Sequence, residues 1–170
     1  PYDTFKDFTA ISEIAYSPLA IVVSKSSPLK NLDELLAAAR EKPESLSYGM
    51  SGNGTSAHLA GELLNYMAKV KIQAIPYKGG APAITAVIAG EIPVSVNPLP
   101  EVVGQIEGNA VRALAVTTAQ RSKALPDVPT VAEAGLPGYD ASVWWGFLGP
   151  AGMAPDLLAK VHADLAAALK

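Results

Sequence analysis

The chain has 170 residues, of which 49% are hydrophobic and 17% charged, the balance of an ordinary globular protein with a buried core. Its 13 Lys and Arg residues are scattered among 16 Asp and Glu residues, so the basic surface that nucleic acids require is missing from the sequence. Cysteine is absent and the two histidines lie far apart, so we predict no disulfide, no metal site and no other cofactor.

Short strand-like runs alternate with segments of helical length along most of the chain. The predicted strands are 19–23, 47–50, 72–75, 92–96, 112–116 and 143–148. The predicted helices begin near residues 31, 55, 81, 100 and 155. This alternation is typical of βαβ units. We therefore predict an α/β fold in which the first four strands belong to one largely parallel sheet with helices on both faces.

Two short motifs predict reciprocal capping, in which a side chain and a backbone N–H three residues apart bond to each other. Asn31 with Glu34 opens the first long helix, and Thr130 with Glu133 follows a segment that two prolines keep irregular. Both motifs mark the start of a helical turn.

A glycine-rich loop between the second strand and its helix is the most informative segment. Its residues are Ser51, Gly52, Asn53, Gly54, Thr55 and Ser56. Glycine lets backbone amides approach a ligand closely, and a helix start offers free N–H groups and a positive dipole end. We predict that this loop contacts an anion. The alternative, equally open on spacing alone, is that Ser and Thr only cap the helix.

The loop after the third strand repeats the pattern with Tyr77, Lys78, Gly79, Gly80 and Ala81. Loops of this kind lie at the carboxyl edge of a parallel sheet, where ligands bind, so two helix starts could hold one carboxylate there. Asn97 follows the fourth predicted strand at the same edge. It could bond to a ligand, or it could cap the next helix.

Other polar and aromatic residues carry weaker signals. His58, in the first turns of a helix, is expected to be packed or solvated more often than it is a ligand contact, and His162 is expected at the surface. Trp144 and Trp145 alternate within a strand, so we expect one to fill a core and the other to face a cleft or partner.

Catalytic motifs fail when they are tested against the sequence. Ser51 lacks the second glycine of a nucleophile elbow, because Asn53 takes its place. The spacing from Gly52 to Ala57 fits a loose dinucleotide fingerprint, yet the next strand ends without an acidic residue for a ribose. We predict that the chain is not an enzyme, with a nucleotide-binding enzyme domain as a remote alternative.

The sequence resembles the Bug-type receptors of tripartite tricarboxylate transporters over essentially its whole length. The stretches that carry the resemblance are 48–62, 76–79 with Pro82 and Ala83, 112–117, 121–122, 125–130 and 133–139. The last two are the most specific.

The resemblance implies a type II periplasmic binding-protein fold, in which two α/β lobes close on a small carboxylate. Residues 17–138 would form the second lobe, 1–16 a crossing segment with a remnant of the first lobe, and 139–170 a crossing strand and helix of that lobe. The receptor would be periplasmic and would deliver a dicarboxylate, tricarboxylate, amino acid or aromatic acid to membrane permease subunits. By resemblance, the two loops and Asn97 line the second lobe's side of the cleft. A ligand-sensing effector domain of a transcription regulator remains the alternative.

The chain opens on Pro1, Tyr2 and Asp3, whereas members of the family carry a further stretch ahead of this region. We therefore expect much of the first lobe, and half of the cleft, to lie outside this chain. Such a truncation would expose apolar surfaces, so we predict self-association of the truncated chain. The sequence does not identify the carboxylate.

Overall fold

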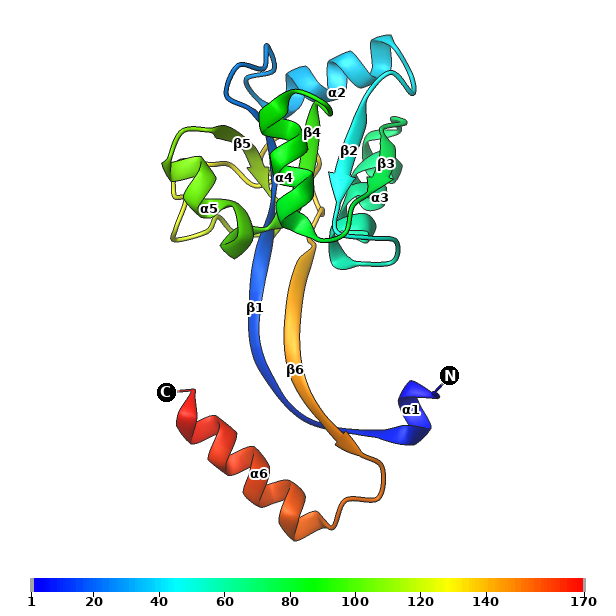
Figure 1. Ribbon diagram of the computed structural model, residues 1–170, viewed down its shortest axis with the longest axis vertical. Helices are drawn as coiled ribbons and strands as arrows, with labels where there is room; N and C mark the ends of the chain where they lie inside the picture. The colour runs from blue at the N-terminus through cyan, green and yellow to red at the C-terminus, as the bar shows by residue number, and fades with distance from the viewer. Residues whose placement is uncertain (1, 170) are drawn as a thin grey trace. The chain divides into compact units, whose positions relative to one another are not determined.

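The computed structural model describes residues 2–169 (Figure 1). The elements are α1 (Thr4–Asp7), β1 (Phe8–Ser24), α2 (Leu32–Glu41), β2 (Ser47–Met50), α3 (Ser56–Ala68), β3 (Gln73–Pro76), α4 (Gly80–Ala89), β4 (Val94–Pro98), α5 (Leu99–Glu107), β5 (Val111–Val116), β6 (Ser142–Pro150) and α6 (Pro155–Ala168). One unit comprises Ser17–Val143, and the other combines residues 2–16 with 144–169. Strands β1 and β6 contribute residues to both units.

The sheet has the strand order β3-β2-β4-β1-β5, and β6 pairs with β1 off this path. Strand β2 runs parallel to β3 and to β4, while β1 runs antiparallel to β4 and to β5. The four strands predicted to share a sheet do share it, but the prediction of a largely parallel sheet is wrong for β1. An apolar strand buried on both faces has the same sequence pattern in either direction, so the pattern did not reveal that β1 is reversed.

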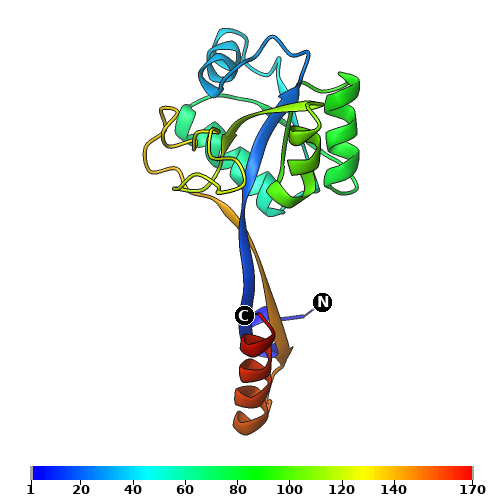
Figure 2. The same ribbon diagram turned by 90° about the vertical axis from the view of Figure 1, so that its left-hand side faces the viewer.

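Helices cover both faces of this sheet, as predicted (Figure 2). Helices α2 and α3 pack on one face, where Leu19, Ile21 and Val23 of β1 contribute to the core. Helices α4 and α5 pack on the other face, toward which Ala20 and Val22 point. This double burial explains why the middle of β1 is continuously apolar, since successive side chains of a strand point to opposite faces.

Both predicted capping motifs form, but the first is not reciprocal as predicted, because the Glu34 carboxylate accepts the backbone N–H of Lys30 and not that of Asn31. The backbone N–H of Glu34 donates to Asn31 Oδ1 at 2.8 Å, and α2 begins there. In the second motif, Thr130 N–H donates to Glu133 Oε2 at 2.9 Å and Glu133 N–H returns a bond to Thr130 Oγ1 at 3.0 Å. The Thr130 N–H, together with the Arg121 guanidinium, lowers the pKa of the Glu133 carboxyl. Residues 131–135, directly after Thr130, form turns, however, and not a helix.

Thr117, directly after β5, joins three separate segments of the Ser17–Val143 unit. Its hydroxyl accepts a bond from Leu19 N–H at 2.8 Å and donates to Ala141 O at 2.7 Å, and the side chain is fully buried. A valine of equal shape would leave the Leu19 donor buried without a partner. We expect Thr117→Val to lower the free energy of unfolding by about 1–3 kcal/mol, measured by urea denaturation of the full-length protein.

Thr118→Val is the matched control for this substitution, because the Thr118 hydroxyl bonds only to the exposed Gln120 carbonyl. Its effect is expected to stay within about 0.5 kcal/mol. Equal losses in the two variants would contradict the assignment of the stabilising role to the buried hydroxyl.

The second unit contains α1, α6 and the parts of β1 and β6 that lie outside Ser17–Val143. Trp144 and Trp145 remain 63% and 41% exposed, so the expectation that one of them fills a core is wrong for this chain. The described residues that pack against the two rings are too few to bury either of them. His162 is exposed, as expected, and its Nδ1 lies 2.9 Å from Ile11 O. Among residues 2–169, no helix is long and apolar enough to cross a membrane.

Candidate functional site

The loop after β2 turns sharply before α3 because two of its glycines adopt positive φ. Gly52 has φ 138° and Gly54 has φ 76°, backbone conformations that other residues rarely adopt. Thr55 is the N-cap of α3, and its hydroxyl accepts a bond from His58 N–H at 3.4 Å. The predicted capping role is therefore real. It uses the N–H of His58 in the first turn of α3 and none of the N–H groups of the loop.

The N–H groups of this loop include bonded and free ones. Gly52 N–H points to Met50 Sδ, Gly54 N–H donates to His58 Nδ1 at 3.0 Å, and Thr55 N–H reaches Gly52 O at 3.4 Å. Within residues 2–169, the N–H groups of Asn53 and Ser56 donate to no protein acceptor. Free donors therefore remain at the start of α3, and no acidic residue lies in its first turn.

His58 has a structural role in this loop. By accepting the Gly54 N–H, its imidazole ties the first turn of α3 back onto the glycine turn. The side chain is half-buried. This contact agrees with the expectation that His58 is packed.

The loop after β3 lies beside the first loop because β2 and β3 are paired in parallel, with Met50 opposite Pro76. Tyr77 N–H donates to Met50 O at 2.9 Å and joins the two loops directly. Gly79, with φ 109°, precedes α4, and no side chain caps that helix. Among the described residues, the N–H groups of Gly80 and Ala81 have no acceptor. Helix α4 thus presents a second N-terminus with free N–H groups at the same edge, and unlike α3 it has no side-chain cap.

Asn97 lies at this edge too, but within β4 and not after it. It pairs with Ala20 of β1, and the N-cap of α5 is Pro98, so the alternative that Asn97 caps the next helix is wrong. The side chain is fully buried. Its Nδ2 donates to Ser95 Oγ, and its Oδ1 has no hydrogen-bond partner in the described part of the chain. A buried amide oxygen without a donor is rare in folded proteins.

All the predicted site residues therefore lie at the carboxyl ends of three neighbouring strands, β3, β2 and β4, either on a strand, on the loop that follows it or at the start of the next helix. Two of those loops lead into helices whose first N–H groups are free. This arrangement suits an anion, since backbone donors and the helix dipoles both favour negative charge.

A supporting contact between β2 and α3 escaped the sequence analysis. Tyr48 is buried beneath α3, and its hydroxyl donates to Glu62 Oε1 at 2.9 Å, with His58 O at 3.3 Å. Burial, and to a smaller extent the bond to Glu62, raises the pKa of Tyr48. Gly61 allows this close approach, because a Cβ there would meet the Tyr48 ring at an impossible distance. The signal available in the sequence was a glycine amid the buried positions of a helix.

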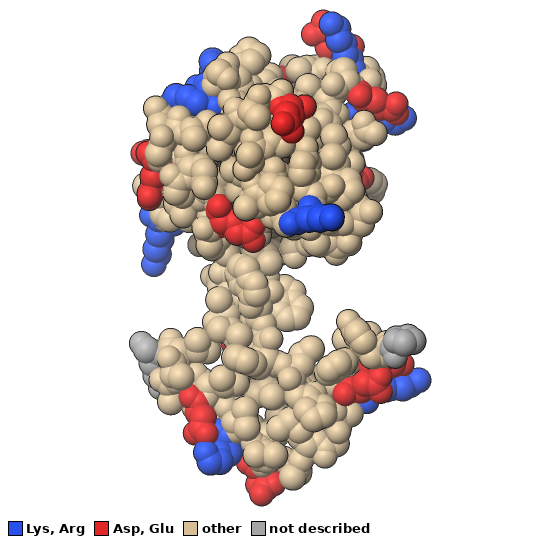
Figure 3. All heavy atoms as spheres, in the orientation of Figure 1, with Lys and Arg blue, Asp and Glu red and all other residues tan. Residues whose placement is uncertain are grey.

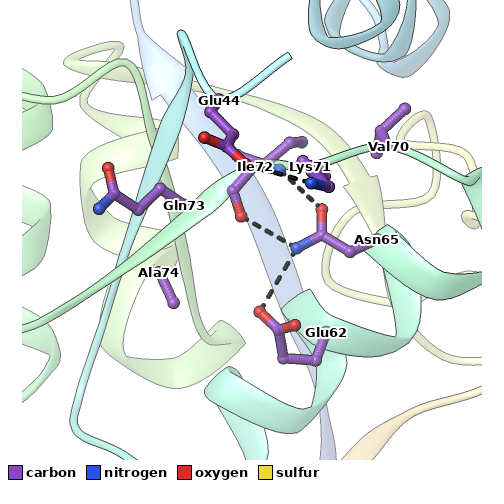
Figure 4. A pocket seen from close by; sticks show the side chains of 8 residues that line it. All are labelled: Glu44, Glu62, Asn65, Val70, Lys71, Ile72, Gln73 and Ala74. Carbon is purple, nitrogen blue, oxygen red and sulfur yellow. Dashed lines mark hydrogen bonds and ion pairs between the residues drawn. The ribbon is translucent and has the colours of Figure 1, made fainter.

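A pocket of about 550 Å³ lies at the edge of the sheet, between α3 and the chain that enters β3 (Figure 4). Asn65 bridges this chain by bonding to both Ile72 N and Ile72 O, at 3.0 and 2.9 Å. Lys71 pairs with Glu44 at 3.3 Å. These polar groups bond to one another, so we interpret their role as holding α3 and the chain that enters β3 together. None of the predicted site residues lines it.

Charges of both signs are interspersed on the face of the molecule drawn in Figure 3, where no patch of a single sign gathers. That the chain does not bind nucleic acid remains a prediction from its composition.

Comparison with known proteins relates this geometry to a family. The model of the tripartite tricarboxylate transporter family receptors matches residues 1–170. The chain is 37% identical over 166 residues to the UPF0065 protein in the tcbD-tcbE intergenic region of Pseudomonas sp. strain P51, covering 97% of this chain and 49% of that protein. It is 31% identical to BugT of Bordetella pertussis, covering all of this chain and 52% of BugT.

Two solved structures show the same fold. Rpa4515 of R. palustris, solved with adipate, superposes with a TM-score of 0.91 at 37% identity, over 98% of this chain and 56% of that one. MatC of Rhodopseudomonas palustris, solved with bound malate, gives a TM-score of 0.88 at 29% identity, over 98% and 57%. The type II periplasmic binding-protein fold that the sequence predicted is thus confirmed.

The chain spans about half the length of the curated relatives that it matches. The family model describes receptors, in agreement with the prediction from the sequence that the chain is not an enzyme. Since the family model matches every residue from end to end, the chain belongs to the tripartite tricarboxylate transporter family of receptors.

Proposed function

We propose that this chain forms one wall of the ligand site of a periplasmic receptor that captures a small carboxylate for a tripartite tricarboxylate transporter. The proposed contacts are Ser51, Gly52, Asn53, Gly54, Thr55, Ser56, Tyr77, Lys78, Gly79, Gly80, Ala81 and Asn97. Residues 17–138 correspond to the second lobe, with 1–16 and 139–170 as crossing segments and parts of the first.

The observation that carries the proposal is the pair of helix starts at the ends of β2 and β3. The strands are hydrogen-bonded neighbours, so the free N–H groups of Ser56 on α3 and of Gly80 and Ala81 on α4 lie at one edge. A hydrogen bond from a neutral donor to a charged group contributes about 1.5–3 kcal/mol. Three such bonds together approach the roughly 8 kcal/mol that corresponds to micromolar affinity.

The ligands of the two related structures support the choice of a carboxylate. Adipate accompanies Rpa4515 and malate accompanies MatC, and both are dicarboxylates. Membership of the family supports the periplasmic location and delivery to permease subunits. Backbone donors recognise a carboxylate whatever is attached to it, so the proposal extends to dicarboxylates, tricarboxylates, amino acids and aromatic acids.

A thermal-shift screen of the full-length protein tests the proposal, with carboxylic acids as ligands and their amides or alcohols as matched controls. A ligand present at 100 times its Kd stabilises the folded state by about 2.7 kcal/mol, which raises the midpoint by several degrees. We expect at least one carboxylate to produce this shift while its amide produces none. The absence of a shift with every acid would contradict the proposed function.

A further inference from the structure

Two acceptor oxygens converge beside the first residue of α4, and neither has a protein donor in the described part of the chain. One is Asn97 Oδ1, and the other is Oε2 of Glu101, in the first turn of α5. Both lie within 3.0 Å of the point where a Cβ on Gly80 would stand, with Asn97 Oδ1 at 2.8 Å. A side chain at position 80 would displace the Glu101 carboxylate and press on the buried Asn97 Oδ1.

The orientation of the Asn97 amide is set by the residue beneath it. The Ser95 hydroxyl has a single proton, and it donates this proton to Gly49 O at 3.1 Å. Ser95 Oγ can therefore only accept from Asn97, so the NH₂ group faces Ser95 and the amide oxygen faces Gly80 and Glu101. Since Asn97 is fully buried, this oxygen gains no compensation from bulk water.

Glu101 adds a charge at the same place. Its carboxylate is exposed and makes no ion pair among residues 2–169. Its carboxylate lies at the N-terminus of α4, where the free N–H groups would also attract a ligand anion. A ligand carboxylate placed beside Glu101 would be repelled, whereas a donor placed between Glu101 and Asn97 would satisfy both oxygens.

We infer that Glu101 and Asn97 form a specificity subsite for a hydrogen-bond donor on the ligand, so that the receptor prefers carboxylates that also bear an ammonium or hydroxyl group. This inference rests on the proposed function and narrows its substrate class. The carboxylate lies against the free N–H groups of Asn53 and Ser56 at the start of α3, and the donor lies between the two oxygens beside Gly80. An ammonium is favoured over a hydroxyl because one of the two acceptors is charged.

Three four-carbon dicarboxylates isolate the contribution of the ligand's hydrogen-bond donor to affinity. Malate carries a hydroxyl and aspartate an ammonium at the same carbon, whereas succinate carries neither. Isothermal titration calorimetry on the full-length protein is expected to give aspartate the lowest Kd and malate an intermediate one. Succinate should bind at least about tenfold more weakly than aspartate, the loss expected for one charge-assisted bond.

Glu101→Gln keeps the size of the side chain but removes its charge. We expect it to reduce the preference for aspartate over succinate to less than about threefold, because the charged acceptor is lost. Glu107→Gln, at the other end of α5, is the matched control and should leave the preference unchanged. Equal affinity for succinate and aspartate in the parent, or an unchanged preference in Glu101→Gln, would overturn the inference.

The outcome also distinguishes failure of the subsite from failure of the site. If succinate binds as tightly as the other two ligands, the subsite inference is wrong and the proposed carboxylate site stands. If none of the three binds, the subsite inference is overturned. The proposed function then survives only if another carboxylate binds in the thermal-shift screen.

Discussion

Replacing Gly61 by alanine is expected to destabilise the Ser17–Val143 unit by about 3 kcal/mol, the upper end for an overpacked core. A Cβ at this position would overlap two ring atoms and the hydroxyl oxygen of Tyr48, a side chain that is only 2% exposed and whose hydroxyl bonds to Glu62 and His58. The ring has no space to retreat, so α3 would have to move off β2. Urea denaturation of the full-length protein measures this loss.

Gly104→Ala is the matched control, because Gly104 also lies inside a helix but its added Cβ would meet nothing within 4 Å. Alanine there should stabilise by about 0.5–1 kcal/mol through its higher helix propensity. The same glycine-to-alanine change is thus expected to lower the free energy of unfolding at position 61 and to raise it at position 104. A Gly61→Ala variant as stable as the parent would show that α3 can shift freely, and the close packing would then have no role in placing the loop.

Replacing Ser56 by proline is expected to raise the Kd for a carboxylate by about 10- to 100-fold, the range for one hydrogen bond to a charged group. Ser56 is the first residue of α3, where proline is well accommodated. Thr55 has φ −74° and ψ 163°, the conformation that a residue before proline prefers. The substitution therefore removes one free N–H donor and leaves the helix intact. Calorimetry with the best carboxylate of the screen measures the change.

Ser56→Ala is the control for the hydroxyl, which this variant removes while it keeps the N–H. Its Kd should stay close to that of the parent if the backbone donor carries the interaction. Thermal unfolding without ligand provides a second check, because proline at a compatible position stabilises by about 0.4–1 kcal/mol. A proline variant that is stable and still binds with the parent's Kd would exclude the Ser56 N–H from the site.

The loops of the candidate site were predictable because their signals are local. Gly52 and Gly54 in one loop, and Gly79 in the other, permit positive φ whatever surrounds them. The capping bond of Glu34 to Asn31 likewise spans only three residues. Residues that are close in sequence are necessarily close in space, so such features can be predicted without knowledge of the fold.

The site's contacts between distant residues were not predictable. Asn97 was expected after its strand and was found inside it, because the register of β4 against β1 decides where the strand ends. Glu101 gave no sequence signal, since its proximity to Gly80 depends on how α5 and α4 pack against the same face of the sheet. The bond from Tyr48 to Glu62 depends in the same way on how α3 lies on β2.

The sequence by itself determined the α/β alternation, the two glycine loops and the family, because each depends on residue type and short spacing. The tertiary structure alone decided that β1 runs against its neighbours and that Asn97 and Glu101 direct their oxygens at one point beside Gly80. Burial pattern is the same for either strand direction. The meeting of two side chains from different elements depends on packing that no local pattern encodes.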